Sequence, residues 1–106
     1  ELTQVNGRAF ELPAGARVVL FVGRLERRKG IDILMRAAAE ILAGDPEAVL
    51  VIAGRDGEGW GRRFEAGLGA GAGGRLHLLG EVDTPTREKL LHVAHCVVFP
   101  SRYESF

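Results

Sequence analysis

The chain has 106 residues, of which 46% are hydrophobic and 26% charged, and its 14 basic and 14 acidic side chains cancel. This composition is that of one small soluble domain, and it excludes the net positive field with which proteins gather nucleic acid. One cysteine cannot form an internal disulfide, and no apolar run approaches the ~20 residues of a membrane span. We therefore expect a cytoplasmic protein with no transmembrane segment and no nucleic-acid partner.

Strands and helices are predicted in alternation after a leader or linker over residues 1–16, which has turn-forming residues at Asn6-Gly7 and 13–15. The run 17–22 is β-branched and apolar on both faces, as is typical of a strand buried in a parallel sheet. A helix is predicted over 31–43, because apolar residues recur there at helical spacing. Its expected inward residues are Ile33, Leu34, Ala37, Ala38, Ile41 and Leu42.

The middle of the chain repeats this pattern. A second buried strand is predicted over 48–53, and Gly54 ends it. A weaker helix is predicted over 60–68, where Trp60, Phe64 and Leu68 are spaced four residues apart but two glycines lower the helix propensity. A short third strand is predicted over 76–79, in which His77 is expected to be a packed or edge histidine.

A third helix and a fourth strand are predicted toward the C-terminal end. Thr84 followed by proline is typical of an N-cap and a first helical turn, so this helix is expected over 84–94. We expect His95 to cap its C-terminus and a buried strand to cover 96–99. The residues of this helix expected to face inward are Leu90, Leu91 and Ala94.

The order β-α-β-α-β-α-β, with glycine or proline bounding the strands, predicts the α/β class. The expected architecture is a Rossmann-like, doubly wound parallel sheet over residues 17–106. In such sheets ligands bind beyond the carboxyl ends of the strands. Functional residues are therefore expected in segments 23–30, 54–59, 80–85 and 100–106.

Segment 23–30 carries four cationic side chains against one acid, Glu26. Because a helix begins directly after it, this loop suits a phosphate, to which Arg24 offers a planar fork and Lys29 a point charge. Gly30 is expected to leave room where backbone and ligand approach. The alternative is a solvated basic loop in which Glu26 is a local partner.

Motifs of other nucleotide and metal sites are missing or misplaced. G-x-G-x-x-G occurs within 69–74, but before a strand and after a helix, which is the wrong context for dinucleotide binding, and no P-loop motif occurs. His92, His95 and Cys96 lack a second pair of ligands, so a structural zinc site is the minor alternative. We predict no metal and no other cofactor.

Glu104 follows the last predicted strand, on the same sheet edge as Arg24. A carboxylate beside a phosphate site is unfavourable unless a ligand group between the two interacts with it. Sugar hydroxyls are such groups, since one carboxylate accepts hydrogen bonds from two of them. The alternative is a solvated loop residue, or an acid at a helix N-terminus.

Four motifs, in this order, carry a resemblance to a known family. They are Phe21-Val-Gly-Arg-Leu25 with Lys29-Gly30, Val51-Ile-Ala-Gly54, Leu79-Gly80-x-Val82 and Phe99-Pro-Ser-x-x-Glu104-Ser-Phe106. Together they resemble the first half of the C-terminal, donor-binding domain of GT-B glycosyltransferases of the group 1 (family 4) type.

The resemblance implies a retaining hexosyltransferase of carbohydrate biosynthesis that uses a UDP-, GDP- or ADP-sugar donor without a metal. Arg24 and Lys29, beside Gly23, would hold the donor diphosphate and stabilise the leaving group, and Glu104 would contact the donor sugar. Further donor contacts are implied for Gly54, Val82, Ser105 and Phe106.

In the resembled family, the carbohydrate or lipid-linked acceptor binds in an N-terminal domain, and a second glutamate follows the first. Neither is found in residues 1–106, so we expect this segment alone to be inactive and its last strand or sheet edge to expose apolar surface. The full-length protein is expected in the cytoplasm, with peripheral contact to the inner face of the membrane. Two alternatives remain: a nucleotide-binding or regulatory module without transferase activity, and a related GT-B synthase or phosphorylase.

Overall fold

A four-stranded parallel sheet forms the centre of the structure, a computed structural model that describes residues 2–5, 8–12, 15–68 and 74–100. The strand order is β5-β4-β3-β6. A helix connects each of these strands to the next one in sequence, which is the predicted Rossmann-like α/β fold. The strands are β3 (Arg17–Val22), β4 (Ala48–Ala53), β5 (Leu76–Gly80) and β6 (Cys96–Val97).

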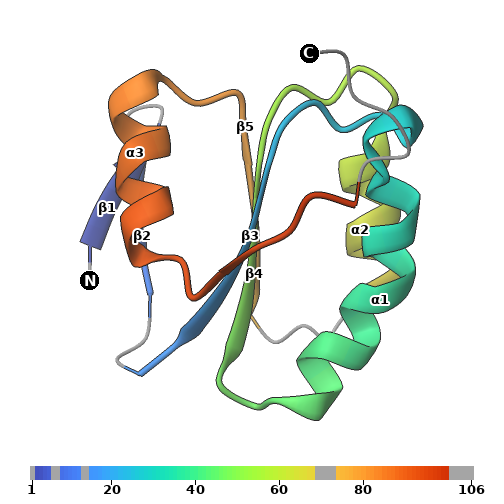
Figure 1. The fold of residues 1–106 in the computed structure, drawn as a ribbon, viewed down its shortest axis with the longest axis horizontal. Coiled ribbons are helices and arrows are strands. Elements are labelled where there is room, and N and C mark those ends of the chain that lie inside the picture. The colour runs from blue at the N-terminus through green and yellow to red at the C-terminus, as the bar shows by residue number, and fades with distance from the viewer. Residues whose placement is uncertain (1, 6–7, 13–14, 69–73, 101–106) are drawn as a thin grey trace.

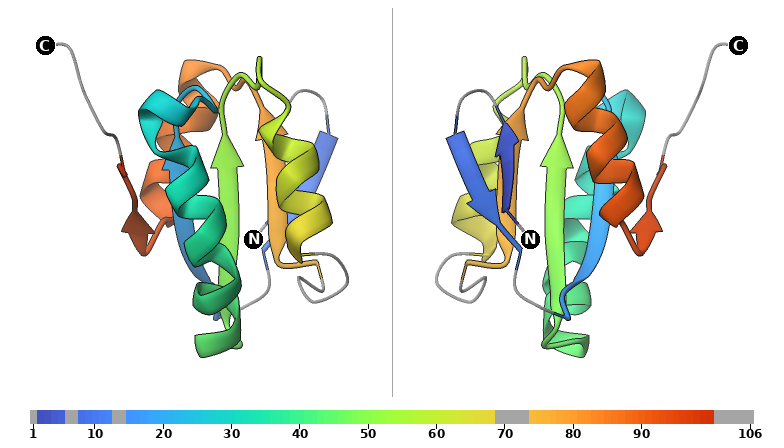
Figure 2. Two further views of the ribbon diagram at one scale, coloured as in Figure 1. Left: turned by 90° about the vertical axis from the view of Figure 1, so that its right-hand side faces the viewer. Right: turned by 90° about the vertical axis from the view of Figure 1, so that its left-hand side faces the viewer.

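Helices cover both faces of this sheet (Figure 1). On one face lie α1 (Ile31–Gly44) and α2 (Trp60–Leu68), and on the other lies α3 (Thr84–Val93). Figure 2 views the sheet from the α1–α2 side and from the α3 side. The chain runs outward from β3 to β4 and β5, and α3 then carries it back across to β6 on the other side of β3.

Strand β4 shows why the central strands are apolar on both faces, since all six of its residues are buried. Leu50 and Ile52 pack in the core under α1 and α2, whereas Val49 and Val51 pack in the core under α3. This period of two divides the strand between two separate cores. At about 1.5–3 kcal/mol for each fully buried aliphatic side chain, the strand is a main contributor to the stability of the domain.

Within residues 1–16, which were expected to be a leader or linker, two strands form a β-hairpin that was not predicted. Strands β1 (Leu2–Val5) and β2 (Arg8–Glu11) pair antiparallel, with Val5 opposite Arg8. They lie on the α3 side of the sheet (Figure 1). Directly after β2, Leu12 is buried in the core under α3, which ties the segment to the rest of the structure.

Some expected inward positions on the helices are wrong. Ile33 is 42% exposed and Leu91 is 44% exposed, because each lies beside the buried stripe of its helix rather than on it. The N-cap of α3 is Asp83, not Thr84: its carboxylate accepts a hydrogen bond from the Thr86 amide at 2.9 Å. The buried residues of α1 are Ile31, Asp32, Leu34, Ala38 and Leu42.

The last strand also differs from expectation. β6 ends at Val97, and Cys96 is exposed because β6 is the outer strand of the sheet. His95 pairs with β3 instead of capping α3: its amide donates to the Val18 carbonyl at 2.9 Å, and its Nδ1 accepts from the Val18 amide at 3.3 Å. The prediction of exposed apolar surface here is confirmed by Phe99, which is 69% exposed.

The expectation for His77 is confirmed. It lies in β5, at the opposite edge of the sheet, and it is half-buried. This burial lowers the pKa of the His77 imidazole, because the charged form loses hydration.

Candidate functional site

The carboxyl ends of β3 and β6 meet at the point where the sheet reverses its direction of growth. The chain runs from β3 outward to β4 and β5, and α3 then returns it to β6 on the other side of β3. Such a point forms the usual ligand crevice of a doubly wound sheet. The predicted basic loop, 23–30, follows β3, and the segment that leads toward Glu104 follows β6.

Gly30 brings these two segments into contact. Its φ is +78°, in the left-handed region, and a Cβ at this position would collide with the carbonyl group of Pro100. The structure gives a reason for a glycine here that was not predicted, the backbone that follows β6, while room for a ligand stays a prediction. The consequence is that the start of α1 lies against the end of the described segment after β6.

The beginning of the basic loop is held against the loop that follows β4. The amide of Gly23 donates to Ala53 O at 3.0 Å, and the amide of Leu25 donates to Arg55 O at 2.9 Å. Leu25 is only 3% exposed and anchors the loop in the core under α1 and α2. Gly54 permits this approach, because a Cβ there would collide with the Gly23 carbonyl.

The two predicted diphosphate ligands lie at either end of this anchored loop. Arg24 is exposed directly after β3, and within the described ranges its side chain makes no hydrogen bond or ion pair. Lys29 is half-buried at the end of a short 3-10 helix, Arg27–Lys29, just before α1. The loop therefore presents one exposed cation and one half-buried cation at the carboxyl edge of the sheet.

The other two cations of the loop lie close to acids. Arg28 Nη2 is 3.6 Å from Glu26 Oε1, a charge contact longer than a hydrogen bond, and Arg27 Nε is 3.8 Å from Asp32 Oδ2. Glu26 is thus a local partner of Arg28, as the alternative of a solvated basic loop expected. Acids therefore lie beside Arg27 and Arg28, whereas Arg24 makes no ion pair within the described ranges.

Asp32 was missed by sequence reasoning. It is 6% exposed in the first turn of α1, and it also pairs with Arg36 at 3.1 Å. An acid in the first turn interacts favourably with the helix dipole and competes with an external anion for the same positive end. The i, i+4 spacing of Asp32 and Arg36 was the available signal.

The loop after β4 also contains acids that sequence reasoning missed. Asp56 precedes α2, and its carboxylate caps the first turn of that helix by accepting hydrogen bonds from the amides of Trp60 at 2.9 Å and Gly61 at 2.8 Å. Burial alone would raise the pKa of Asp56, but these two amides and those of Gly59 and Glu58 outweigh it and lower the pKa. The cap is therefore charged throughout the neutral range.

Gly54 and Val82, two of the implied donor contacts, lie on neighbouring loops. The amide of Gly54 donates to Gly80 O at 2.8 Å, which ties the end of β4 to the end of β5. Val82 follows β5, and its half-buried side chain packs against the core under α3. Contact between Val82 and a nucleobase through its main chain stays a prediction.

Glu104, Ser105 and Phe106 lie outside the described residues. Their roles stay predictions, as do the roles of Gly23, Arg24 and Lys29. Across residues 2–5, 8–12, 15–68 and 74–100, no three His, Cys, Asp or Glu side chains are grouped as ligands of a metal ion.

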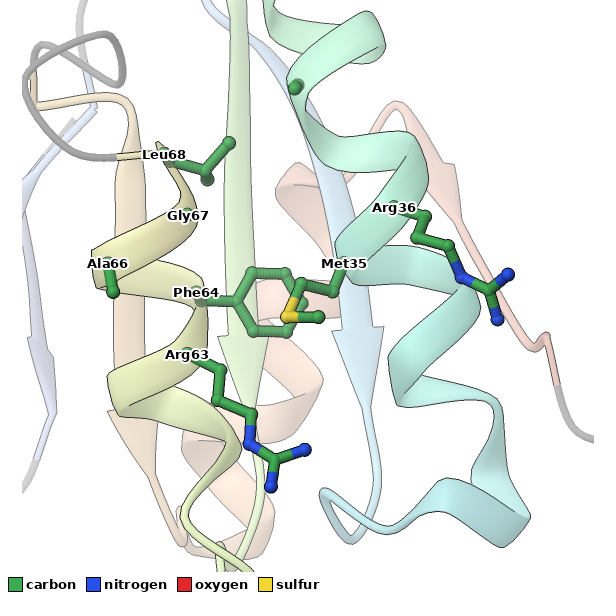
Figure 3. A pocket seen from close by; sticks show the side chains of 8 residues that line it. Met35, Arg36, Arg63, Phe64, Ala66, Gly67 and Leu68 are labelled. Carbon is green, nitrogen blue, oxygen red and sulfur yellow. The ribbon is translucent and has the colours of Figure 1, made fainter.

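A groove of about 380 Å³ lies between α1 and α2, away from the strand ends (Figure 3). Its floor is apolar, with Met35 against Phe64, and the side chains of Arg36 and Arg63 extend from its two walls. None of the predicted site residues lines it. It is therefore separate from the predicted site at the carboxyl ends of the strands.

Residues 5–106 match the family model described as "Glycosyl transferases group 1". The chain belongs to this family. A group 1 glycosyl transferase is what the four motifs at the strand ends predicted, and the match includes the segment that contains Glu104.

Curated relatives agree with this assignment. The chain is 37% identical over 95 residues to a D-inositol 3-phosphate glycosyltransferase of Rhodococcus jostii, covering 84% of this chain and 21% of that protein. It is 39% identical over 103 residues to the protein of that name from Nocardiopsis dassonvillei, covering 90% and 24%. An uncharacterized glycosyltransferase of Methanocaldococcus jannaschii is 40% identical over 99 residues, covering 93% and 25%. The chain thus spans about a quarter of the length of these relatives.

A solved structure shows the same fold. The crystal structure of the C-terminal domain of a group 1 family glycosyl transferase from Francisella tularensis superposes with a TM-score of 0.75 at 21% identity. The superposition covers 85% of this chain and 49% of the Francisella tularensis chain. Within the described part of the group 1 chain, none of the helices has the length and hydropathy needed to cross a bilayer.

Proposed function

We propose that this chain forms the donor-binding part of a retaining glycosyltransferase that moves a sugar from a nucleoside diphosphate sugar to an acceptor. The observation that carries the proposal is the basic loop between Gly23 and Gly30. It follows the carboxyl end of β3 beside β6, where doubly wound sheets usually bind ligands, and it contacts the segment after β6 through Gly30 and Pro100. Membership of the group 1 family supports the reaction class.

Arg24 and Lys29 are proposed to bind the two phosphates of the donor. When the bond between the sugar and the diphosphate breaks, negative charge grows on the leaving group, and two fixed cations stabilise it more than they stabilise the intact donor. Arg24 matches two phosphate oxygens with its planar fork, and Lys29 acts as a compact charge near the start of α1. We propose that these side chains, without a metal, supply the charge stabilisation.

Glu104 is proposed to read the donor sugar by accepting hydrogen bonds from its hydroxyls, with backbone amides near Ser105 and Phe106 beside it. Gly54 and Val82 are proposed to lie near the ribose and the base. The names of the curated relatives make D-inositol 3-phosphate one acceptor to test, beside carbohydrate and lipid-linked acceptors. We place the reaction in the cytoplasm, with peripheral contact to the inner face of the membrane.

Two ligands separate the role of Glu104 from that of the cations. Binding of a nucleoside diphosphate and of the matching nucleoside diphosphate sugar is measured by calorimetry in the complete protein. Glu104→Ala is expected to weaken the binding of the nucleoside diphosphate sugar and to leave the binding of the nucleoside diphosphate unchanged. If the variant weakens the binding of both ligands equally, Glu104 does not contact the sugar.

A second candidate keeps the same site with a different reaction. A phosphorylase of this fold would use inorganic phosphate as the acceptor, so sugar transfer to inorganic phosphate separates it from a transferase. A synthase would move the sugar from the nucleotide to a second sugar, so a sugar acceptor tests that alternative. A nucleotide-binding module would bind the donor without turnover in the complete protein. The chain of 106 residues alone is expected to transfer no sugar, because the acceptor cannot be positioned beside the donor.

A further inference from the structure

Glu58 ties the basic loop to the second helix through one carboxylate oxygen. Its Oε1 accepts a hydrogen bond from the indole Nε1 of Trp60 at 2.8 Å and another from the backbone amide of Arg27 at 3.3 Å. Trp60 begins α2, whereas Arg27 belongs to the loop that follows β3. One side chain therefore connects two loops that are 31 residues apart in sequence.

The anchor of this connection is rigid. Trp60 is only 6% exposed and belongs to the core under α1 and α2. Its backbone amide is held by Asp56, and the guanidinium of Arg63 lies 4.5 Å from the centre of its ring. The indole N–H consequently has a fixed direction, and Glu58 is held where it meets the Arg27 amide.

The place of the tie matters for the proposed site. The backbone bonds from Gly23 and Leu25 hold the first part of the loop, and α1 holds the part after Gly30. Arg27 lies between these anchors, and also between Arg24 and Lys29. A restraint at the Arg27 amide therefore limits how far the two cations can move relative to each other.

The charge of Glu58 opposes the function that we propose for the loop. A carboxylate near cations lowers their attraction for a diphosphate. Its geometry, with one oxygen shared by two N–H donors, makes the opposite contribution by ordering the loop before the ligand binds. These two effects predict opposite signs when the side chain is removed, so they can be separated.

We propose that Glu58 is a positioning residue for donor binding, which holds the Arg24–Lys29 loop against α2 through Trp60. This proposal rests on the proposed function of the loop. It assigns no contact between Glu58 and the donor. The carbonyl oxygen of a glutamine can accept the same two hydrogen bonds without the charge, which gives a conservative variant.

The test compares Glu58→Ala and Glu58→Gln in the complete protein, with Glu65→Ala and Glu65→Gln as matched controls. Glu65 is exposed on α2, so its variants make the same charge changes without touching the loop. The dissociation constant of the nucleoside diphosphate is expected to rise about fivefold to tenfold in Glu58→Ala, the usual size of one lost hydrogen-bonded tie. In Glu58→Gln the dissociation constant is expected to be equal to or lower than that of the wild type.

Hydrogen exchange without ligand gives a second, independent reading. The Arg27 amide is expected to exchange faster in Glu58→Ala than in the wild type, and at the wild-type rate in Glu58→Gln and in both Glu65 variants. Unchanged exchange in Glu58→Ala would overturn the tie. Faster exchange with unchanged or tighter diphosphate binding would overturn its role in positioning.

The same measurements separate this proposal from the proposed function. If Arg24→Ala and Lys29→Ala leave diphosphate binding unchanged, the function of the loop is wrong, whatever Glu58 does to the Arg27 amide. If those variants weaken binding but both Glu58 variants resemble the Glu65 controls, the loop binds the donor and Glu58 does not position it.

Discussion

Gly30 lies so close to Pro100 that any side chain at residue 30 would collide with the Pro100 carbonyl group. This contact joins the loop after β3 to the segment after β6, and both segments carry residues predicted to bind the donor. The packing of two backbones therefore brings the two segments together at this point.

Gly30→Ala is expected to destabilise the domain by at least about 1–2 kcal/mol from its left-handed backbone alone, with the collision adding to this. It is also expected to weaken donor binding, because the Pro100 segment must move. The matched control is Gly67→Ala in α2, where nothing lies within 4 Å of the added Cβ. This control is expected to gain about 0.5–1 kcal/mol. Urea unfolding of both variants checks the opposite signs, and a neutral Gly30→Ala would contradict the contact.

The Asp56 cap gives a prediction for α2. Asp56→Ala leaves the Trp60 and Gly61 amides without their acceptor and is expected to cost about 1 kcal/mol, within the usual range of N-cap losses. Asp56→Asn keeps an acceptor and is expected to cost less. Chemical denaturation of the two variants measures the difference. If Asp56→Ala unfolds at the wild-type denaturant concentration, the cap contributes nothing to stability.

The Arg17–Asp45 pair predicts a dependence of stability on acid. Arg17 donates to both carboxylate oxygens of Asp45, at 2.6 and 2.5 Å, and this bond lowers the pKa of Asp45 to about 2. A lowered pKa means that the unfolded chain takes up the proton first. The contribution is therefore present above about pH 4 and is lost as the pH falls toward 2.

Asp45→Asn removes the titrating carboxyl group, and Arg17→Ala removes the largest cause of its lowered pKa. The stability lost by each variant relative to the wild type is expected to be largest near neutral pH and to shrink between pH 4 and 2. This difference in stability is measured by thermal unfolding at a series of pH values. A difference that stays constant down to pH 2 would show that the pair does not titrate as described.

The strands β3 and β4 could be predicted from the sequence because a strand buried on both faces is apolar at every position. The hairpin of β1 and β2 could not, since strands of four residues leave little pattern. The strand ends also indicated Arg24 and Lys29, because the sheet places its loops at one edge. Roles that depend on contacts distant in sequence were missed or misassigned, as for Glu58 with Arg27, Gly30 with Pro100, and His95 with Val18.

We propose that Arg24 and Lys29 bind the donor diphosphate, and the affinity of that ligand tests this role. The measurement is the dissociation constant of a nucleoside diphosphate for Arg24→Ala and Lys29→Ala in the complete protein, with Arg62→Ala, exposed on α2, as the control of equal charge. Each of the two variants is expected to bind at least about tenfold more weakly, since hydrogen bonds to charged groups contribute about 1.5–3 kcal/mol, while the control binds as the wild type does. Wild-type affinity in both variants, or an equal loss in Arg62→Ala, would contradict the claim.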